Sequence, residues 1–179
     1  MIYFRSLICA LTVSLVACSS TVVLEQVAPE PNINQDHGAT TISLRIEKGV
    51  RDTYVQDGTP SMIGVEVRDW HKSLRSAFRH SFRRSIPTMG NHPDLTIRLL
   101  KAEFSIVPAA VTSGGQAAAV RGSIRYQANL VARDGTVVRR IANTAFSKRG
   151  FSERAQVSVA AADAIETMFE EIAAEFFAQ

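Results

Sequence analysis

The sequence predicts an α+β fold, a two-layer sandwich in which a mostly antiparallel four-stranded sheet has two helices on one face. Two amphipathic segments, residues 62–86 and 155–177, have the periodicity of helices. Four segments that alternate or are rich in β-formers indicate the strands. The order β-α-β-β-β-α requires a helical crossover between the first two strands and leaves the last three as a meander. Because each helix has one apolar stripe, both are expected on the same face of the sheet.

The N-terminus has the features of an export signal. Arg5 precedes a short apolar run that ends in Leu15-Val16-Ala17-Cys18. The run is shorter than the roughly 20 residues that cross a bilayer, and a basic start with a short apolar centre is typical of a secretory signal. Its last four residues resemble the lipobox of bacterial lipoproteins. The alternative is a buried helix that ends in a chance cysteine.

The lipobox resemblance implies cleavage before Cys18 and acylation of that residue, and several acyl chains anchor a protein stably to a membrane. Ser19 follows the cysteine. In the sorting rule of many Gram-negative bacteria, serine there implies the outer membrane, with the protein facing the periplasm. The expected organisation is a lipoprotein signal peptide (1–17), a lipidated cysteine with a flexible tether (18–40) and a single α+β domain (41–179). The alternative for part of the tether is that Val22 to Val27 dock on the domain.

The composition argues against several classes of function. The chain has 20 basic and 17 acidic residues, a formal net charge of +3, which is not the balance of a dedicated nucleic-acid binder. Its two cysteines are Cys9, within the signal, and Cys18. The mature domain is therefore expected to contain no disulfide, no thiolate metal site and no cysteine nucleophile, and to be stabilised by its apolar core.

The first strand and first helix are predicted from apolar spacing. Residues 41–46, TISLRI, alternate apolar and polar side chains as a half-buried strand does. The helix over 62–86 should end before Pro87. Its apolar stripe comprises Val67, Trp70, Leu74, Phe78 and Phe82.

The remaining strands are predicted from the long segment 94–108 and from a hairpin around Asp134-Gly135, a pair typical of type I′ turns, in which both central residues have positive φ. The strand before the turn should place on one face Ile124, Tyr126, Ala128 and Leu130. The strand after it permits two registers, whose inward residues are either Ile141 and Ala145 or Val138, Ala142 and Phe146.

The order of these features resembles YajG-type outer-membrane lipoproteins. The shared features are a lipobox, a polar tether, a short strand, an amphipathic helix, the strand DLTIRLLKAEF, the hairpin GSIRYQANLVARDG and an alanine-rich final helix. The similarity spans most of the chain after the signal and lies in architecture. The general plan is also that of other small periplasmic α+β auxiliary lipoproteins that assist envelope transporters. The resemblance implies a fold and a location but no active site, because this family has no established reaction.

The sequence gives no pattern for catalysis or for a cofactor. His71 and His80 lie nine residues apart on the first predicted helix, so they should point to opposite sides and cannot share a metal. His37 and His92 lie in polar segments. The glycine-rich residues 113–116 lack the lysine of a phosphate-binding loop. We expect no enzyme activity, no catalytic residue, no metal and no cofactor.

Two surfaces are candidates for binding. The first is a basic stripe on the first helix, which would meet an anionic lipid, lipopolysaccharide phosphates or an acidic protein; it comprises Arg68, Lys72, Arg75, Arg79 and Arg83. The alternative is that this stripe is simply solvated or is paired with acidic residues of the last helix, Glu166, Glu170 and Glu175. The second is the uncovered face of the sheet, expected to include Thr96, Arg98, Leu100, Arg125, Gln127, Asn129 and Val131.

These observations predict a lipid-anchored outer-membrane protein that acts as a non-catalytic binding or scaffold accessory in the cell envelope. The alternative is an auxiliary component that binds or transports an envelope lipid or lipopolysaccharide. A small hydrolase is a third possibility, which would need a deep pocket with convergent polar groups. The expected partners are the membrane, through N-terminal acyl chains, and an envelope protein or anionic lipid, but no nucleic acid.

Overall fold

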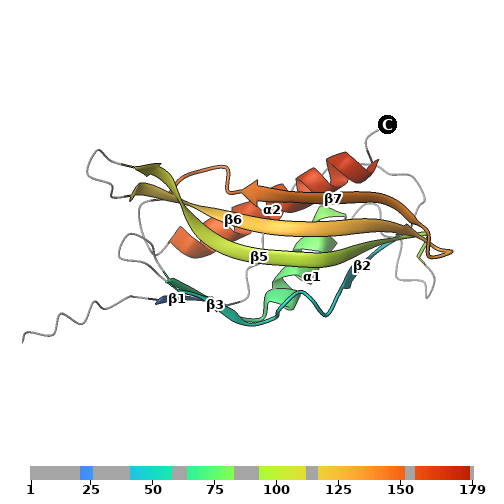
Figure 1. Ribbon diagram of the computed structural model, residues 1–179, viewed down its shortest axis with the longest axis horizontal. Coiled ribbons are helices and arrows are strands. Elements are labelled where there is room, and N and C mark those ends of the chain that lie inside the picture. Colours follow the sequence, from blue (N-terminus) through green and yellow to red (C-terminus); the bar gives the residue numbers. More distant parts are fainter. Residues whose placement is uncertain are drawn as a thin grey trace, which may run out of the picture.

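The computed structural model describes residues 21–25, 41–57, 64–82, 93–111, 117–151 and 156–177. Its main sheet has the strand order β2-β5-β6-β7 (Figure 1). The strands are β2 (Ile42–Ile46), β5 (Leu95–Val111), β6 (Ala117–Ala132) and β7 (Val137–Phe146). β2 is parallel to β5, and β5, β6 and β7 form an antiparallel meander. The α+β fold and the four-stranded sheet predicted from the sequence are thus confirmed.

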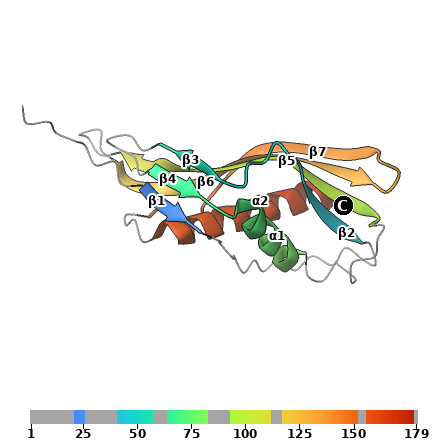
Figure 2. The same cartoon turned by 90° about the horizontal axis from the view of Figure 1, so that it is seen from below.

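Both helices lie on one side of this sheet, as predicted (Figure 2). α2 (Val157–Phe177) packs against β6 and β7, and α1 (Trp70–Ser81) lies beside α2. The helices meet through aromatic rings: Phe82 lies edge-on to Phe169 with 6.3 Å between ring centroids. α2 supplies the centre of the core with ten buried residues, which are Val157, Ala160, Ala161, Ala164, Ile165, Met168, Phe169, Ile172, Ala173 and Phe176.

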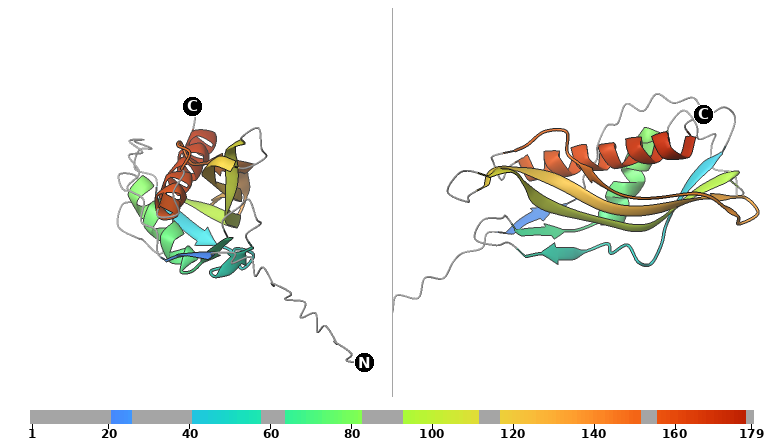
Figure 3. Two further views of the ribbon diagram at one scale, coloured as in Figure 1. Left: turned by 90° about the vertical axis from the view of Figure 1, so that its left-hand side faces the viewer. Right: turned by 45° about the horizontal axis from the view of Figure 1, so that its top comes forward.

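A second, smaller sheet was not predicted. It has the order β1-β4-β3 and consists of β1 (Thr21–Leu24), β3 (Tyr54–Gln56) and β4 (Gly64–Val67). Seen from the end, α2 is surrounded by the main sheet, the small sheet and α1 (Figure 3). β1 lies within the segment 18–40 predicted as a tether; its Leu24 is buried in the core and its backbone pairs in parallel with β4.

The first helix begins later than predicted, because residues 64–67 form β4 and the chain turns at Asp69, whose φ is 51°. The side chain of Asp69 makes no capping hydrogen bond. Asp52, from the segment before β3, replaces it: its carbonyl accepts the Trp70 N–H (3.0 Å) and its carboxylate accepts the His71 N–H (2.7 Å). These bonds satisfy donors that every helix N-terminus leaves without an intrahelical partner.

β5 contains an irregularity that changes which side chains face the core. Its pairing with β6 shifts between Leu99 and Lys101, so Ile97 and Leu99 face inward before the shift and Ala102, Phe104 and Ile106 after it. Beyond this β-bulge, none of the strands that the structure describes pairs with β5 on its β2 side. Its backbone is satisfied there by three side chains. The Trp70 Nε1–H donates to the Ala102 carbonyl (2.9 Å), the Tyr54 hydroxyl bonds both the N–H and the carbonyl of Phe104, and the Gln56 side-chain oxygen accepts the Ile106 N–H (3.0 Å).

The hairpin occurs where predicted, but its turn is not type I′. Only Gly135 has positive φ (89°); Asp134 does not. The Gly135 N–H donates to the Ala132 carbonyl, and the Ala132 N–H donates to the Thr136 carbonyl, both at 2.9 Å. This is a type I turn followed by a glycine bulge, which adds one residue to the loop. The register is set by a second irregularity, between Leu130 and Val131, where β7 contains an extra residue at Val138; beyond it, Ile141 and Ala145 face α2.

The start of β2 is fastened to the start of β5 by one carboxylate. Asp94 accepts hydrogen bonds from the backbone N–H (3.1 Å) and hydroxyl (2.8 Å) of Thr41, and it forms an ion pair with Arg133 (2.6 Å). The Thr41 bonds, followed by the charge of Arg133, lower the pKa of Asp94 below its usual value. The ionised carboxylate is therefore favoured by folding.

We expect this carboxylate to make stability depend on acid pH. Because the folded-state pKa of Asp94 is lowered, its contribution is complete above its ordinary pKa of about 3.9 and is lost as pH falls through the folded value. Urea unfolding between about pH 5 and pH 2 should therefore show a steeper loss of stability in the natural protein than in Asp94→Asn. Asp134, whose pKa is also lowered, is present in both proteins and cancels from the comparison. Parallel stability curves would contradict this role of Asp94.

Candidate binding surfaces

The basic stripe predicted on the first helix is only partly on α1. Lys72, Arg75 and Arg79 are exposed on the helix, whereas Arg68 precedes it and pairs with Glu66 on β4 (2.8 Å). Arg83 and Cys18 lie outside the described residues. Within the described part of the chain, the three helical cations make no ion pair.

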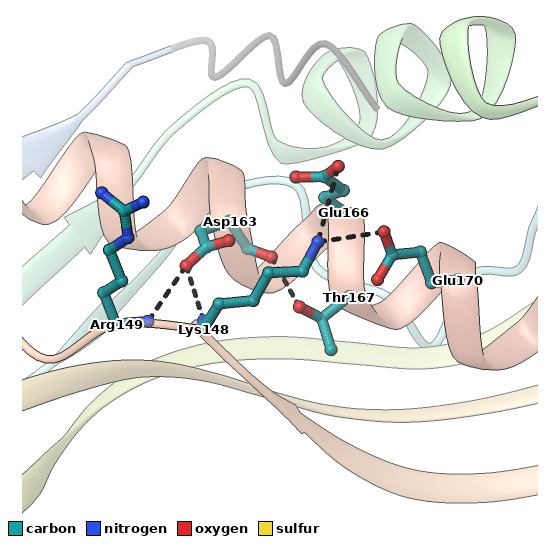
Figure 4. A network of polar contacts seen from close by, with 6 residues as sticks. All are labelled: Lys148, Arg149, Asp163, Glu166, Thr167 and Glu170. Carbon is teal, nitrogen blue, oxygen red and sulfur yellow. Dashed lines mark hydrogen bonds and ion pairs between the residues drawn. The ribbon is translucent and has the colours of Figure 1, made fainter. Parts of the chain in front are cut away.

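The acidic side of α2 is occupied by another cation. The Lys148 ammonium lies 3.0 Å from Glu170 and 3.7 Å from Glu166, and the Asp163 carboxylate accepts the backbone N–H groups of Lys148 and Arg149 (Figure 4). The hydrogen bond to Glu170 is the main cause of a raised pKa at Lys148. Hence the described ion pairs of Glu166 and Glu170 fasten the end of β7 to α2 and do not neutralise α1.

The outer face of the main sheet, opposite the helices, is rich in arginine and lysine. β2, β5, β6 and β7 all contribute. We call the following set the cationic sheet face: Arg45, Arg98, Lys101, Arg121, Arg125 and Arg140.

Two carboxylates lie among these cations, and both are already shared. Glu47 pairs with Arg45 (3.1 Å) and Arg98 (2.7 Å), and Glu103 pairs with Lys101 (3.1 Å) and, more distantly, Arg51 (3.8 Å). The remaining cations of the face, Arg121, Arg125 and Arg140, are exposed and form no ion pair within the described ranges. An anionic partner would therefore meet them without displacing an internal carboxylate.

A groove of about 530 Å³ crosses this face between β3 and β7. Its floor contains the hydroxyls of Ser105, Ser123 and Thr144, and the first two are hydrogen-bonded to each other (2.7 Å). Arg51 and Arg125 also line it. Its apolar lining includes Val55, which is 57% exposed, and Phe146, which is 45% exposed. The groove thus presents two arginines and the Glu103 carboxylate together with hydroxyl groups and apolar surface.

The sequence predicted Arg98 of β5 and Arg125 of β6 on this face, but not Lys101, Arg121 or the wall of the groove. Tyr54 and Val55 lie between the predicted first strand and the predicted first helix, where no element is expected from the sequence, and β3 is only three residues long. The prediction that Val131 adds exposed apolar surface to this face is wrong, because its side chain is buried. Leu100 is half-buried at the β-bulge. The apolar atoms that are exposed on this face belong instead to Phe146 and Val138.

The described histidines have separate positions. A ring nitrogen of His71 lies 2.7 Å from the Val50 carbonyl, and its other nitrogen lies 3.7 Å from Asp52, so His71 holds the β2–β3 connection against α1. His80 is exposed. In the described ranges, no group of three His, Cys, Asp or Glu side chains is placed to hold a metal ion. No helix in these ranges is both long and apolar enough to cross a membrane.

No protein-family model matches the sequence, and no curated protein matches it. A minor lipoprotein from Acinetobacter baumannii is 12% identical, with a TM-score of 0.44 over 75% of this chain and 88% of that one. An uncharacterised lipoprotein B from Nitrosomonas europaea is 12% identical, with a TM-score of 0.40 over 84% of this chain and 88% of that one.

The crystal structure of protein XCC0632 from Xanthomonas campestris, described with the family model DUF330, is more similar. It is 15% identical to this chain, with a TM-score of 0.53, and the match covers 86% of this chain and 92% of that protein. At this identity the likeness concerns the fold alone. The chain therefore shares the fold of XCC0632 over nearly the whole length of that protein.

Proposed function

We propose that this protein is a lipid-anchored, non-catalytic binding module of the bacterial cell envelope, on the outer membrane and facing the periplasm. The anchor is supported by the lipobox Leu15-Val16-Ala17-Cys18 at the end of a short apolar run, and the membrane by Ser19. The resemblance to YajG-type lipoproteins and the lipoprotein descriptions of several structural neighbours agree with this assignment.

The observation that supports a binding role most strongly is the cationic sheet face. The helices and the small sheet bury the other side of the main sheet, whereas Arg121, Arg125 and Arg140 remain exposed and unneutralised within the described residues. Arginine forms paired hydrogen bonds with carboxylate and phosphate groups. The face is therefore suited to an acidic protein surface next to the domain.

A non-catalytic role agrees with the use of polar side chains inside the fold. The Tyr126 hydroxyl donates to Glu171 (2.7 Å), which also accepts a hydrogen bond from Asn143 (3.0 Å). Burial, together with Glu171, raises the pKa of Tyr126, and burial raises that of Tyr54. Both hydroxyls therefore stay protonated and serve as structural donors.

The proposal is tested by photo-crosslinking of the full-length lipoprotein in cells. A photoreactive residue at Gln127 or Ala142, exposed neighbours in one row of the sheet face, should form one protein adduct of defined mass. The double variant Arg125→Glu/Arg140→Glu should reduce this adduct about tenfold, because like charges repel the acidic partner. Neither arginine is buried, so stability should change by less than about 0.5 kcal/mol.

The matched control is Arg75→Glu/Arg79→Glu, which reverses the same number of exposed charges on α1. It should leave the sheet-face adduct unchanged. An adduct that forms only from a photoreactive residue at Lys72, and that the α1 variant abolishes, would instead assign binding to the helix. Absence of any adduct from either surface would count against a binding module.

A second function, binding of an envelope lipid or lipopolysaccharide, is favoured by the groove. Arg51 and Arg125 would meet phosphate oxygens while Val55 and Phe146 contact the start of an acyl chain. Lipid that binds the folded state raises the melting temperature. Addition of phosphatidylglycerol or lipopolysaccharide to the detergent-solubilised full-length protein should therefore raise its Tm, and Arg125→Glu or Phe146→Ser should remove that increase. An equal increase in these variants would exclude the groove.

A further inference from the structure

β7 forms one edge of the main sheet, and none of the strands that the structure describes pairs with its outer side (Figure 1). The strand has ten residues, of which six are exposed, and it contains no proline. Strands of globular proteins are usually about five or six residues long, and natural edge strands are often shortened or interrupted by proline. An edge of this length presents a row of backbone groups to which a strand of another chain can pair.

The hydrogen bonds between β6 and β7 show which backbone groups point toward that edge. The Ser147 N–H donates to the Gly122 carbonyl (2.8 Å), and the pairing continues without a shift back to Arg139. In an antiparallel pair, residues that bond to the neighbouring strand alternate with residues that do not. The backbone N–H and carbonyl groups that point away from β6 are therefore those of Arg140, Ala142, Thr144 and Phe146. Within the described ranges, these groups have no hydrogen-bond partner.

Both faces of the sheet are accessible beside this edge. On the outer face, Val138 is 53% exposed and Phe146 is 45% exposed. On the inner face, beside α2, Arg139 and Asn143 are exposed and Ile141 is only half-buried. α2 therefore does not cover the side chains of β7 completely. A strand added at the edge would find side chains to contact on both faces.

The charges next to the edge are all of one sign. Residues 136–149 contain no acidic residue and four basic ones, which are Arg139, Arg140, Lys148 and Arg149. Arg139 donates to the backbone carbonyl of Glu175, which leaves its charge unneutralised. Like charges that lie opposite each other on paired strands are destabilising, and opposite charges are stabilising. The edge is therefore suited to a strand that carries carboxylates.

We propose that the acidic protein partner binds by adding an extended strand to the outer edge of β7. This inference rests on the proposed function and specifies how the partner of the cationic sheet face is held. In this mode of recognition, main-chain hydrogen bonds supply affinity and alternate side chains supply specificity. Arg140 and Phe146 lie six residues apart on the outer face. The added strand should therefore carry an acidic residue opposite Arg140 and, six positions away, an apolar residue opposite Phe146.

The test is photo-crosslinking of the full-length lipoprotein in cells from both faces of the sheet. One photoreactive residue replaces Gln127, which is exposed on the outer face beside Ala142, and another replaces Asn143, which is exposed on the inner face. A strand at the edge is reached from both positions. Mass spectrometry should locate both crosslinks in the same segment of one protein, and that segment should contain the acidic and apolar residues six positions apart.

A pair of variants at Ala142 tests whether the backbone is what binds. Ala142→Pro removes an N–H that points outward and puts a ring in the path of the added strand, and proline is tolerated on an edge strand where the N–H faces solvent. It should lower the crosslink from Asn143 at least about tenfold. The matched control Ala142→Ser changes the same exposed side chain but keeps the N–H, so it should leave the crosslink within about twofold.

Three results would overturn the edge site and leave the proposed function intact. The first is a crosslink from Gln127 without one from Asn143, which would place the partner on the outer face alone. The second is an unchanged crosslink in an Ala142→Pro protein whose circular dichroism shows that it is folded. The third is an equal loss in both Ala142 variants, which would assign the effect to the side chain. If Ala142→Pro does not fold, the two crosslinks in the natural backbone still decide. No crosslink from either position, or from α1, would instead refute the binding module itself.

Discussion

Replacement of Trp70 with alanine is expected to lower the free energy of unfolding by about 4 kcal/mol, the middle of the range for a buried tryptophan. The side chain is 1% exposed and lies beside Phe104, with 6.2 Å between ring centroids. Its Nε1–H also donates to the Ala102 carbonyl, on the part of β5 beyond the β-bulge. The substitution removes core volume and leaves a buried backbone acceptor without its donor.

A second variant, Trp70→Phe, separates these two effects. It keeps most of the apolar ring but loses the N–H, so we expect a smaller loss of about 2 kcal/mol. Trp70 is the only tryptophan, so urea unfolding must be followed by far-ultraviolet circular dichroism. Equal losses for the two variants would assign the whole effect to the hydrogen bond, and a negligible loss for Trp70→Phe would show that the Ala102 carbonyl finds another donor.

Gly122→Ala is expected to destabilise the protein by about 3 kcal/mol, at the upper end of the usual cost of overpacking. β6 lies close to α2 here. A Cβ on Gly122 would lie 2.6 Å from the Ala160 carbonyl oxygen and 2.9 Å from the Phe104 ring. The strand cannot retreat easily, because the Gly122 N–H and carbonyl are both bonded to Ser147.

Gly150→Ala is the matched control. A Cβ at Gly150 would meet its nearest neighbour at 3.4 Å, which is ordinary contact. We therefore expect stability to change by less than about 0.5 kcal/mol or to rise slightly, since alanine restricts the unfolded chain. Thermal unfolding of the three proteins side by side tests the comparison. A tolerated Gly122→Ala would show that α2 can move away from the sheet.

Local periodicity was sufficient to predict the main sheet and α2. The strand face Ile124, Tyr126, Ala128 and Leu130 is buried as expected, because strict alternation leaves one assignment. For β4 the apolar periodicity was ambiguous, since Val67 fits both the apolar stripe of a helix and the buried face of a strand. What decides is the turn at Asp69 and the cap from Asp52, which lies 17 residues earlier and has no local signal.

The candidate surfaces were predictable to a similar degree. Exposed arginines on a strand can be read from alternation, so Arg98 and Arg125 were identified, but the β-bulge reverses the alternation after Leu99. The partners of charged residues are distant in the sequence. Nothing in the sequence indicates that Lys148 forms ion pairs with Glu166 and Glu170. For the same reason, the contact of β3 with β5 could not be anticipated.

The pairing of the four-residue strand β1 with β4 determines how much free chain lies between Cys18 and the domain. While β1 is held, a lipidated Cys18 is separated from the domain by at most about 11 Å of chain. If β1 separated from β4, the free chain would extend from Cys18 to Thr41. A flexible chain of that many residues has a root-mean-square end-to-end distance of about 26 Å. Tension along the anchor would load the β1–β4 hydrogen bonds in shear, all at once. If Cys18 is acylated as proposed, the state of this one short strand would decide whether the domain lies directly against the membrane or ranges over a wider volume beside it.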